Sequence, residues 1–152
     1  MKEILQWPDA QLEEVHDYIQ WMFPLTERSA FNIQAPVLTP SEISEIRLSP
    51  ELRQNLKASF VRILGFYGLI LSGSYPLKVK RALHFEEASA NWISPENHNH
   101  LRITRILKCL LTLGLEEEAR AFYDCLEDIY RAESARSSPV FQKRLFHFGS
   151  ER

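Results

Sequence analysis

The stretch "ENHNHLRITRILKCLLTLGLEEEA", residues 96–119, has the pattern of two helices joined by a glycine. Its apolar residues recur at helical spacing, so they fall on one face of a helix. They are Ile103, Ile106, Leu107, Leu110 and Leu113. Gly114 is predicted to end this helix, because glycine adopts the left-handed backbone of a C-terminal cap without a steric penalty. The glutamates after Gly114 favour a second helix start, where the helix dipole attracts negative charge.

Segments with a proline near a helix start extend this helical pattern over the chain. They are WPDAQLEE at Trp7, TPSE at Thr39, SPEL at Ser49 and SPEN at Ser94. In TPSE, Thr39 and Glu42 have the spacing of a capping box. Apolar spacing also predicts a first, a central and a last helix. Their stripes are Leu12, Val15, Ile19 and Met22; Leu52, Leu56, Phe60, Ile63, Tyr67 and Ile70; and Ala119, Phe122, Leu126 and Ile129.

The strand signal is weak by comparison. YPLKVKRALHF, residues 75–85, is the only stretch with a short apolar–polar alternation, and it does not predict a strand convincingly. We therefore predict an all-α fold, a single compact irregular bundle of about five to seven helices. Residues 1–133 form the predicted helical domain, and residues 134–152 form a tail whose aromatic stretch would allow it to dock.

The composition is that of an ordinary globular protein, with 45% apolar and 25% charged residues in a chain of 152. The net charge of −2 lacks the basic excess that dedicated nucleic-acid binders usually carry. The N-terminus lacks the apolar run of a signal peptide, and no apolar stretch is long enough for a membrane span, so we expect a cytoplasmic protein. Cys109 and Cys125 lie inside helical patterns, which predicts buried free thiols.

His98 and His100 are the first candidates for a chemical role. Residues two apart on a helix point to different faces, so the pair cannot chelate one metal from a helix. No carboxylate or third histidine lies nearby at ligand spacing. We therefore expect neither a metal nor another cofactor.

The helix that contains these histidines has two distinct polar sides. A rotation of about 100° per residue places His98, Arg105 and Lys108 on an outward basic stripe, with Arg102 at its edge. The same rotation places Asn99 inward, where its amide would satisfy backbone or loop polar groups.

The second candidate stretch is HDYIQWMFP, residues 16–24. The same rotation places Trp21 among the acidic residues Glu14 and Asp17, away from the apolar stripe. Because large aromatic side chains are normally covered, we predict that the loop from Pro24 to Pro36 folds over Trp21. The alternative is a partly open aromatic pocket at this place.

Several of these motifs together resemble the conserved region of the opioid growth factor receptor family. They are HDYIQWMFPL (16–25) with Ala30, Phe31, Asn32, Ala35 and Pro36 after it, FYGL (66–69), NWISPENHNHLRITRIL (91–107) and LGLEEEA (113–119). The resemblance spans about Trp7 to Tyr130. It implies an α-helical, non-enzymatic binding domain. The vertebrate members are described as nuclear-associated receptors for the pentapeptide Met-enkephalin that restrain cell proliferation, and they carry long additional C-terminal segments with repeats.

We therefore predict a non-catalytic, receptor-like domain that binds a protein or peptide partner, which the sequence does not identify. The predicted surface lies where the end of the first helix and the following loop meet the helix start near residue 97. Its candidate residues are His16, Asp17, Tyr18, Trp21, Asn97, His98, Asn99, His100, Arg102 and Arg105.

Two other functions stay open. One is a small hydrolase or lyase, which requires at least two of His16, Asp17, His98 and His100 within hydrogen-bond reach in a cleft. The other is nucleic-acid binding, which requires the basic helix stripe to align with further basic residues such as Lys78, Lys80 and Arg81.

Overall fold

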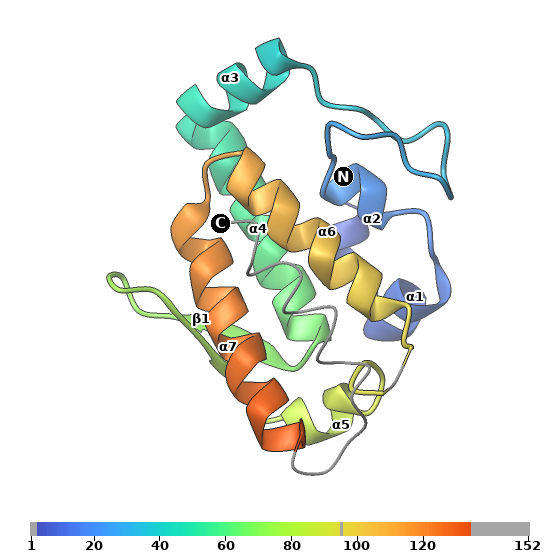
Figure 1. Cartoon of the computed structure of the whole chain (residues 1–152), viewed down its shortest axis with the longest axis vertical. Helices are drawn as coiled ribbons and strands as arrows, with labels where there is room; N and C mark the ends of the chain where they lie inside the picture. The colour runs from blue at the N-terminus through green and yellow to red at the C-terminus, as the bar shows by residue number, and fades with distance from the viewer. Residues whose placement is uncertain (1–2, 95, 135–152) are drawn as a thin grey trace.

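The computed structural model describes residues 3–94 and 96–134, and its centre is formed by three long helices (Figure 1). They are α4 (Pro50–Phe66), α6 (Asn99–Thr112) and α7 (Glu116–Ser134). The predicted stripes of α6 and α7 are buried from Ile103 to Leu113 and from Ala119 to Ile129. On α4, Phe60 and Ile63 are fully covered. These three stripes supply a large part of the hydrophobic core, as their spacing predicts.

Shorter elements surround this centre. The helical ones are η1 (Ile4–Gln6), α1 (Asp9–Glu14), α2 (Ile19–Met22), α3 (Pro40–Leu48) and α5 (Phe85–Ser89). The strands β1 (Leu69–Ser72) and β2 (Lys78–Arg81) form an antiparallel hairpin in which Leu69 faces Arg81 and Leu71 faces Val79. The hairpin packs against α4 and α7 on one side of the molecule, at the left of Figure 1, whereas α1 and α2 lie at the right.

The prediction of an all-α fold is therefore correct in part: the described residues are mostly helical, but they also contain a two-stranded sheet. The seven α-helices of the described residues match the expected number, but the hairpin is an addition that the sequence did not predict. Its second strand lies within the short alternating stretch at residues 75–85. Ile70, predicted on the central helix, lies in β1 and is half-exposed.

Gly68 explains why the central helix stops early. It follows the last turn of α4 with a φ of +73°, and its carbonyl accepts a hydrogen bond from Ala82 N–H at 2.8 Å. A left-handed residue at this position is a common helix C-terminal signal. The chain therefore leaves the helix at Tyr67, which stays buried, and enters the hairpin.

The other predicted helix ends are mostly confirmed. Thr39 and Glu42 form the capping box of α3, and the Ser49 side chain caps α4. Gly114 has a φ of +88° after α6, and Leu115 N–H donates to Leu110 O at 2.8 Å, as in a Schellman cap. The start predicted at Ser94 is wrong, because α6 begins at Asn99.

The first helix is not continuous, contrary to the prediction. It divides into α1 and α2, because the backbone becomes extended at Val15. Leu12, Ile19 and Met22 are nevertheless buried. At this break the backbone carbonyls of Leu12 and Val15 face α6, where they accept hydrogen bonds from Arg102.

Both cysteines are free and buried, as predicted. Burial raises the pKa of Cys109 to about 12, although the neighbouring Arg105 opposes this effect. Burial likewise raises the pKa of Cys125 to about 11. Both thiols therefore stay protonated near neutral pH and behave as core side chains. The predicted tail at 134–152 lies outside the described residues, apart from Ser134 at the end of α7.

Gly68 provides a test of this fold. We expect Gly68→Ala to lower the free energy of unfolding by about 2–3 kcal/mol, since its positive φ disfavours a side chain and a Cβ would crowd α5. That Cβ would lie 2.7 Å from Phe85 Cα and 2.9 Å from Ala88 Cβ. Gly65→Ala is the matched control, because its Cβ meets nothing within 4 Å and the helix should gain up to about 1 kcal/mol. Equal melting temperatures for the two variants would contradict the proposed role of Gly68.

Candidate functional site

Arg102 is buried, so its predicted place at the edge of an outward basic stripe is wrong. Its guanidinium donates hydrogen bonds to Leu12 O and Val15 O, both at 3.0 Å. These carbonyls lie where α1 ends, so Arg102 caps that helix from a distant part of the chain. The guanidinium also lies 5.3 Å from the ring centroid of Tyr18, in a cation–π contact.

Two other arginines cap helix ends in the same way. Arg105 is half-buried and donates to Phe23 O, at the end of α2, at 3.0 Å. Arg47 donates to Leu111 O and Thr112 O at the end of α6, and pairs with Glu116 at 3.0 Å. Arginines therefore fasten α1, α2 and α6 to their neighbours.

Asn99 points inward and is fully buried, as predicted. Its Nδ2 donates to Glu13 Oε2 at 3.3 Å, and its Oδ1 accepts from Arg102 at 3.3 Å. The backbone N–H of Asn99 donates a hydrogen bond to Asn97 Oδ1 at 3.0 Å. Asn99 thus joins α1 to α6 and helps to orient Arg102.

His98 and His16 lie next to each other, 5.1 Å between ring centroids, from α6 and from the segment between α1 and α2. Glu13 approaches His98 to 3.3 Å. Burial lowers the pKa of His98, although Glu13 favours the charged form. No hydrogen bond links the side chains of His16, Asp17 and His98 within the described residues.

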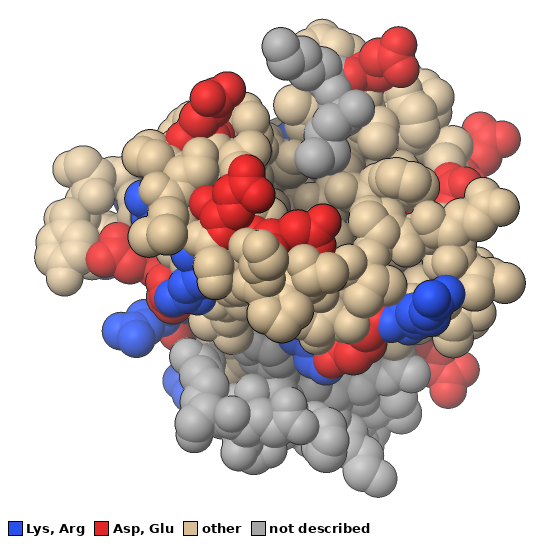
Figure 2. All heavy atoms as spheres, turned by 90° about the horizontal axis from the view of Figure 1, so that it is seen from above, with Lys and Arg blue, Asp and Glu red and all other residues tan. Residues whose placement is uncertain are grey.

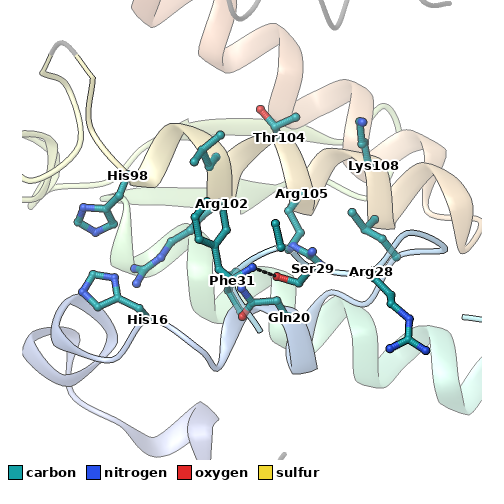
Figure 3. Close-up of a pocket in the computed structure, with 14 residues that line it drawn as sticks. His16, Gln20, Arg28, Ser29, Phe31, His98, Arg102, Thr104, Arg105 and Lys108 are labelled. Carbon is teal, nitrogen blue, oxygen red and sulfur yellow. Dashed lines mark hydrogen bonds between the residues drawn. The ribbon is translucent and has the colours of Figure 1, made fainter. Parts of the chain in front are cut away.

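A cleft of about 510 Å³ opens between α2, the loop that follows it and α6. Figure 3 shows His16 and His98 at one end, and Arg28 and Lys108 toward the other. Its lining residues are His16, Ile19, Gln20, Leu25, Arg28, Ser29, Ala30, Phe31, His98, Leu101, Arg102, Thr104, Arg105 and Lys108. The lining contains no aspartate or glutamate, so its charged side chains are all basic.

The cleft therefore lies where the sequence placed a binding surface, but it uses only part of the predicted set. His16, His98, Arg102 and Arg105 line it. The other predicted residues, Asp17, Tyr18, Trp21, Asn97, Asn99 and His100, do not.

Of these six, Tyr18 is buried against Arg102, and burial raises its pKa to about 12. His100 is also buried, and its Nε2 lies 2.9 Å from Trp92 O, to which it donates. Asp17 is exposed and accepts, through its backbone carbonyl, from Asn32 Nδ2 at 3.5 Å.

The prediction for Trp21 is wrong, because 49% of its surface is exposed. The loop does fold back, since Leu38 N–H donates to Leu25 O at 2.9 Å and Leu25 bridges Val37. It covers the cleft side of α2 instead, where Leu25 and Phe31 line the wall. Trp21 does not line this cleft.

Sequence reasoning included this loop in the predicted surface but named none of the loop residues that line the cleft. Arg28, Ser29, Ala30 and Phe31 have no helical period that would assign them to a face. Their signal is the loop's length together with its apolar residues, because long loops in compact domains are often functional. Gln20 was missed because a single polar residue beside Trp21 carries no pattern.

The basic residues do not form one continuous stripe. Lys78, Lys80 and Arg81 belong to the hairpin strand β2, whereas Arg105 and Lys108 face the cleft beside α2, on the other side of the molecule in Figure 1. On the face seen in Figure 2, acidic and basic side chains are interspersed. The alignment that nucleic-acid binding would require is absent from the described residues.

Two further properties concern the described residues alone. No group of three His, Cys, Asp or Glu side chains there is arranged to hold a metal ion. None of the helices there has the length and apolar character to cross a membrane.

With this geometry defined, comparison with known proteins assigns the chain to a receptor-like class. Residues 3–126 match the model of the opioid growth factor receptor (OGFr) conserved region. The chain belongs to the opioid growth factor receptor family, as its motifs indicated. No solved structure matches it.

Its relatives include longer proteins from several vertebrates. The chain is 44% identical to the mouse opioid growth factor receptor and 42% identical to the human one, in both cases over 76% of its own length. It is 40% identical to opioid growth factor receptor-like protein 1 of Xenopus tropicalis over 70% of its length. These matches cover 18%, 17% and 20% of the three relatives, so the chain spans at most about a fifth of their length.

Asn99 gives a test of the site's framework. We expect Asn99→Ala to lower the free energy of unfolding by about 1–3 kcal/mol, because it removes the buried amide that hydrogen-bonds to both Glu13 and Arg102. Asn55→Ala is the control, since Asn55 is exposed on α4 and should change stability by less than about 0.5 kcal/mol. Urea denaturation of both variants measures the difference. A neutral Asn99→Ala would show that the link between α1 and α6 does not depend on this amide.

Proposed function

We propose that the chain is a non-catalytic binding module whose cleft between α2, the following loop and α6 holds a peptide segment of a partner protein. The observation that carries this proposal is the cleft itself, whose volume of about 510 Å³ suits a small ligand or a short segment. It is partly apolar, through Ile19, Leu25 and Leu101, and its charges are basic. Membership in a family whose relatives are named receptors supports a binding role.

Acid–base catalysis is the alternative, and the pair of His98 and Glu13 beside His16 favours it. Binding is better supported because the cleft's hydroxyls are already engaged. Ser29 Oγ accepts from the backbone N–H groups of Phe31 and Asn32, and Thr104 Oγ1 donates to His100 O. Neither hydroxyl is paired with a histidine side chain that could activate it as a nucleophile.

We also propose that the protein acts in a reducing compartment such as the cytoplasm. Two buried free thiols support this proposal, since cysteines in oxidising compartments usually form disulfides.

Selection of displayed random peptides tests the binding proposal directly. We expect peptides selected on the natural chain to lose binding to Ala30→Trp, because Ala30 is exposed and lines the cleft, so an indole there should obstruct it. Ala58→Trp is the control, since Ala58 is exposed on α4 outside the cleft. Failure to select any peptide that distinguishes these two variants would contradict the proposal.

A further inference from the structure

Three cationic side chains line the cleft on the side away from the two histidines. Arg105 and Lys108 are three residues apart on α6 and therefore share a face, while Arg28 reaches the cleft from the loop (Figure 3). Within residues 3–94 and 96–134, no carboxylate forms an ion pair with any of the three. Arg105 uses one N–H for Phe23 O, which leaves most of its donors for another partner.

The Gln20 side chain indicates that the ligand also supplies a hydrogen-bond donor. Its side chain lines the cleft and is only 7% exposed, yet its Oε1 is buried without a hydrogen-bond partner. A buried amide oxygen is stabilised only by a donor, such as the N–H of a peptide bond. An anion without an N–H, such as phosphate, would satisfy the three cations but not Gln20.

The apolar part of the cleft narrows the ligand further. Ile19, Leu25 and Leu101 form its wall, and the Phe31 ring at its edge is 88% exposed. Aromatic rings on the surface of a binding site commonly contact apolar ligand side chains. A ligand that fills the cleft would therefore combine negative charge, an N–H donor and an apolar side chain.

We infer that the cleft recognises an acidic peptide segment, with carboxylates paired to Arg28, Arg105 and Lys108, a backbone N–H donated to Gln20 Oε1, and an apolar side chain against Phe31 and Leu101. This inference rests on the proposed function and specifies the ligand's chemistry. Charge-assisted hydrogen bonds between guanidinium and carboxylate supply the orientation. The apolar contact and the Gln20 acceptor favour a peptide over a free phosphate or a nucleic-acid backbone.

The test uses three pools of short synthetic peptides with the same apolar residues. One pool carries Asp and Glu, the second carries Asn and Gln in their place, and the third carries Lys. We expect the acidic pool to bind the full chain about tenfold more tightly than the amide pool, with an affinity that falls as salt rises. Fluorescence anisotropy of the labelled pools measures the affinity of each pool and its dependence on salt. Inorganic phosphate serves as a competitor and should displace the acidic pool only weakly.

Variants assign this preference to the three cations and to Gln20. Arg28→Gln with Lys108→Gln should weaken the acidic pool about tenfold, whereas Lys80→Gln with Arg120→Gln, which removes the same charge from exposed residues outside the cleft, should not. Gln20→Leu should weaken the acidic pool and raise the melting temperature of the unbound chain, because it removes an acceptor that has no partner. A purely structural Gln20 would lower the melting temperature instead.

Each other outcome overturns the inference. If the acidic and amide pools bind equally and Ala30→Trp abolishes both, the cleft binds peptides but not through their charge, so the proposed function stands alone. If phosphate displaces the acidic pool as strongly as unlabelled peptide does, the site is an anion site without peptide specificity. If no pool binds, the inference and the proposed function fail together.

Discussion

Arg102→Ala should lower the free energy of unfolding by about 3–5 kcal/mol, as expected when one partner of a buried charged network is removed. The substitution would leave Leu12 O, Val15 O and Asn99 Oδ1 without their donor, in a region where water has little access. It would also remove the cation that lies over the Tyr18 ring. Urea denaturation with a fitted m-value measures the loss.

Two variants separate this role from a simple loss of charge. Arg102→Lys keeps the charge, but an ammonium lacks the planar fork that reaches two carbonyls, so most of the loss should remain. Arg105→Ala removes a half-buried arginine with one carbonyl partner and should cost about 1 kcal/mol. If Arg102→Ala costs no more than Arg105→Ala, Arg102 does not fasten α1, and its guanidinium is available to a ligand.

The arginine caps also show which parts of this fold the sequence could predict. Long stripes such as Ile103–Leu113 were predictable, because burial along one helix repeats with the helical period. The break between α1 and α2 was not, because the carbonyls it frees are satisfied by Arg102, ninety residues from Leu12 in the sequence. The same arginine looked like a surface residue, since periodicity assigns a face but not what covers it.

The hairpin and the cleft were difficult for a related reason. In β2 only Val79 is buried among four residues, so little apolar alternation was available to indicate a strand. The cleft lies at the meeting of the two motifs from which a binding surface was predicted. However, its cations at the far end come partly from the loop at Arg28, where no periodic pattern exists. Membership in the family was predictable because specific motifs, rather than periodicity, carry it.

Trp92 is the second residue from which we expect a large effect. It is fully buried, its Nε1 donates to Tyr67 O at 3.1 Å, and its ring packs edge-on against Tyr67 and Phe85. It thereby joins the end of α4 to α5 and to the segment before α6, where its own carbonyl accepts from His100. We expect Trp92→Ala to lower the free energy of unfolding by about 3–5 kcal/mol, because it leaves a large cavity.

Trp21→Ala is the matched control, since it removes the same side chain from a half-exposed position and should cost less than about 1 kcal/mol. Trp92→Phe isolates the indole hydrogen bond, because it keeps an aromatic ring in the core but leaves Tyr67 O without its donor. Its cost should lie between those of the two alanine variants. Thermal melts of the three variants, monitored by near-ultraviolet circular dichroism, measure their losses of stability. If Trp21→Ala proved as destabilising as Trp92→Ala, the loop would cover Trp21 after all, and the cleft wall formed by Leu25 and Phe31 would have to be placed elsewhere.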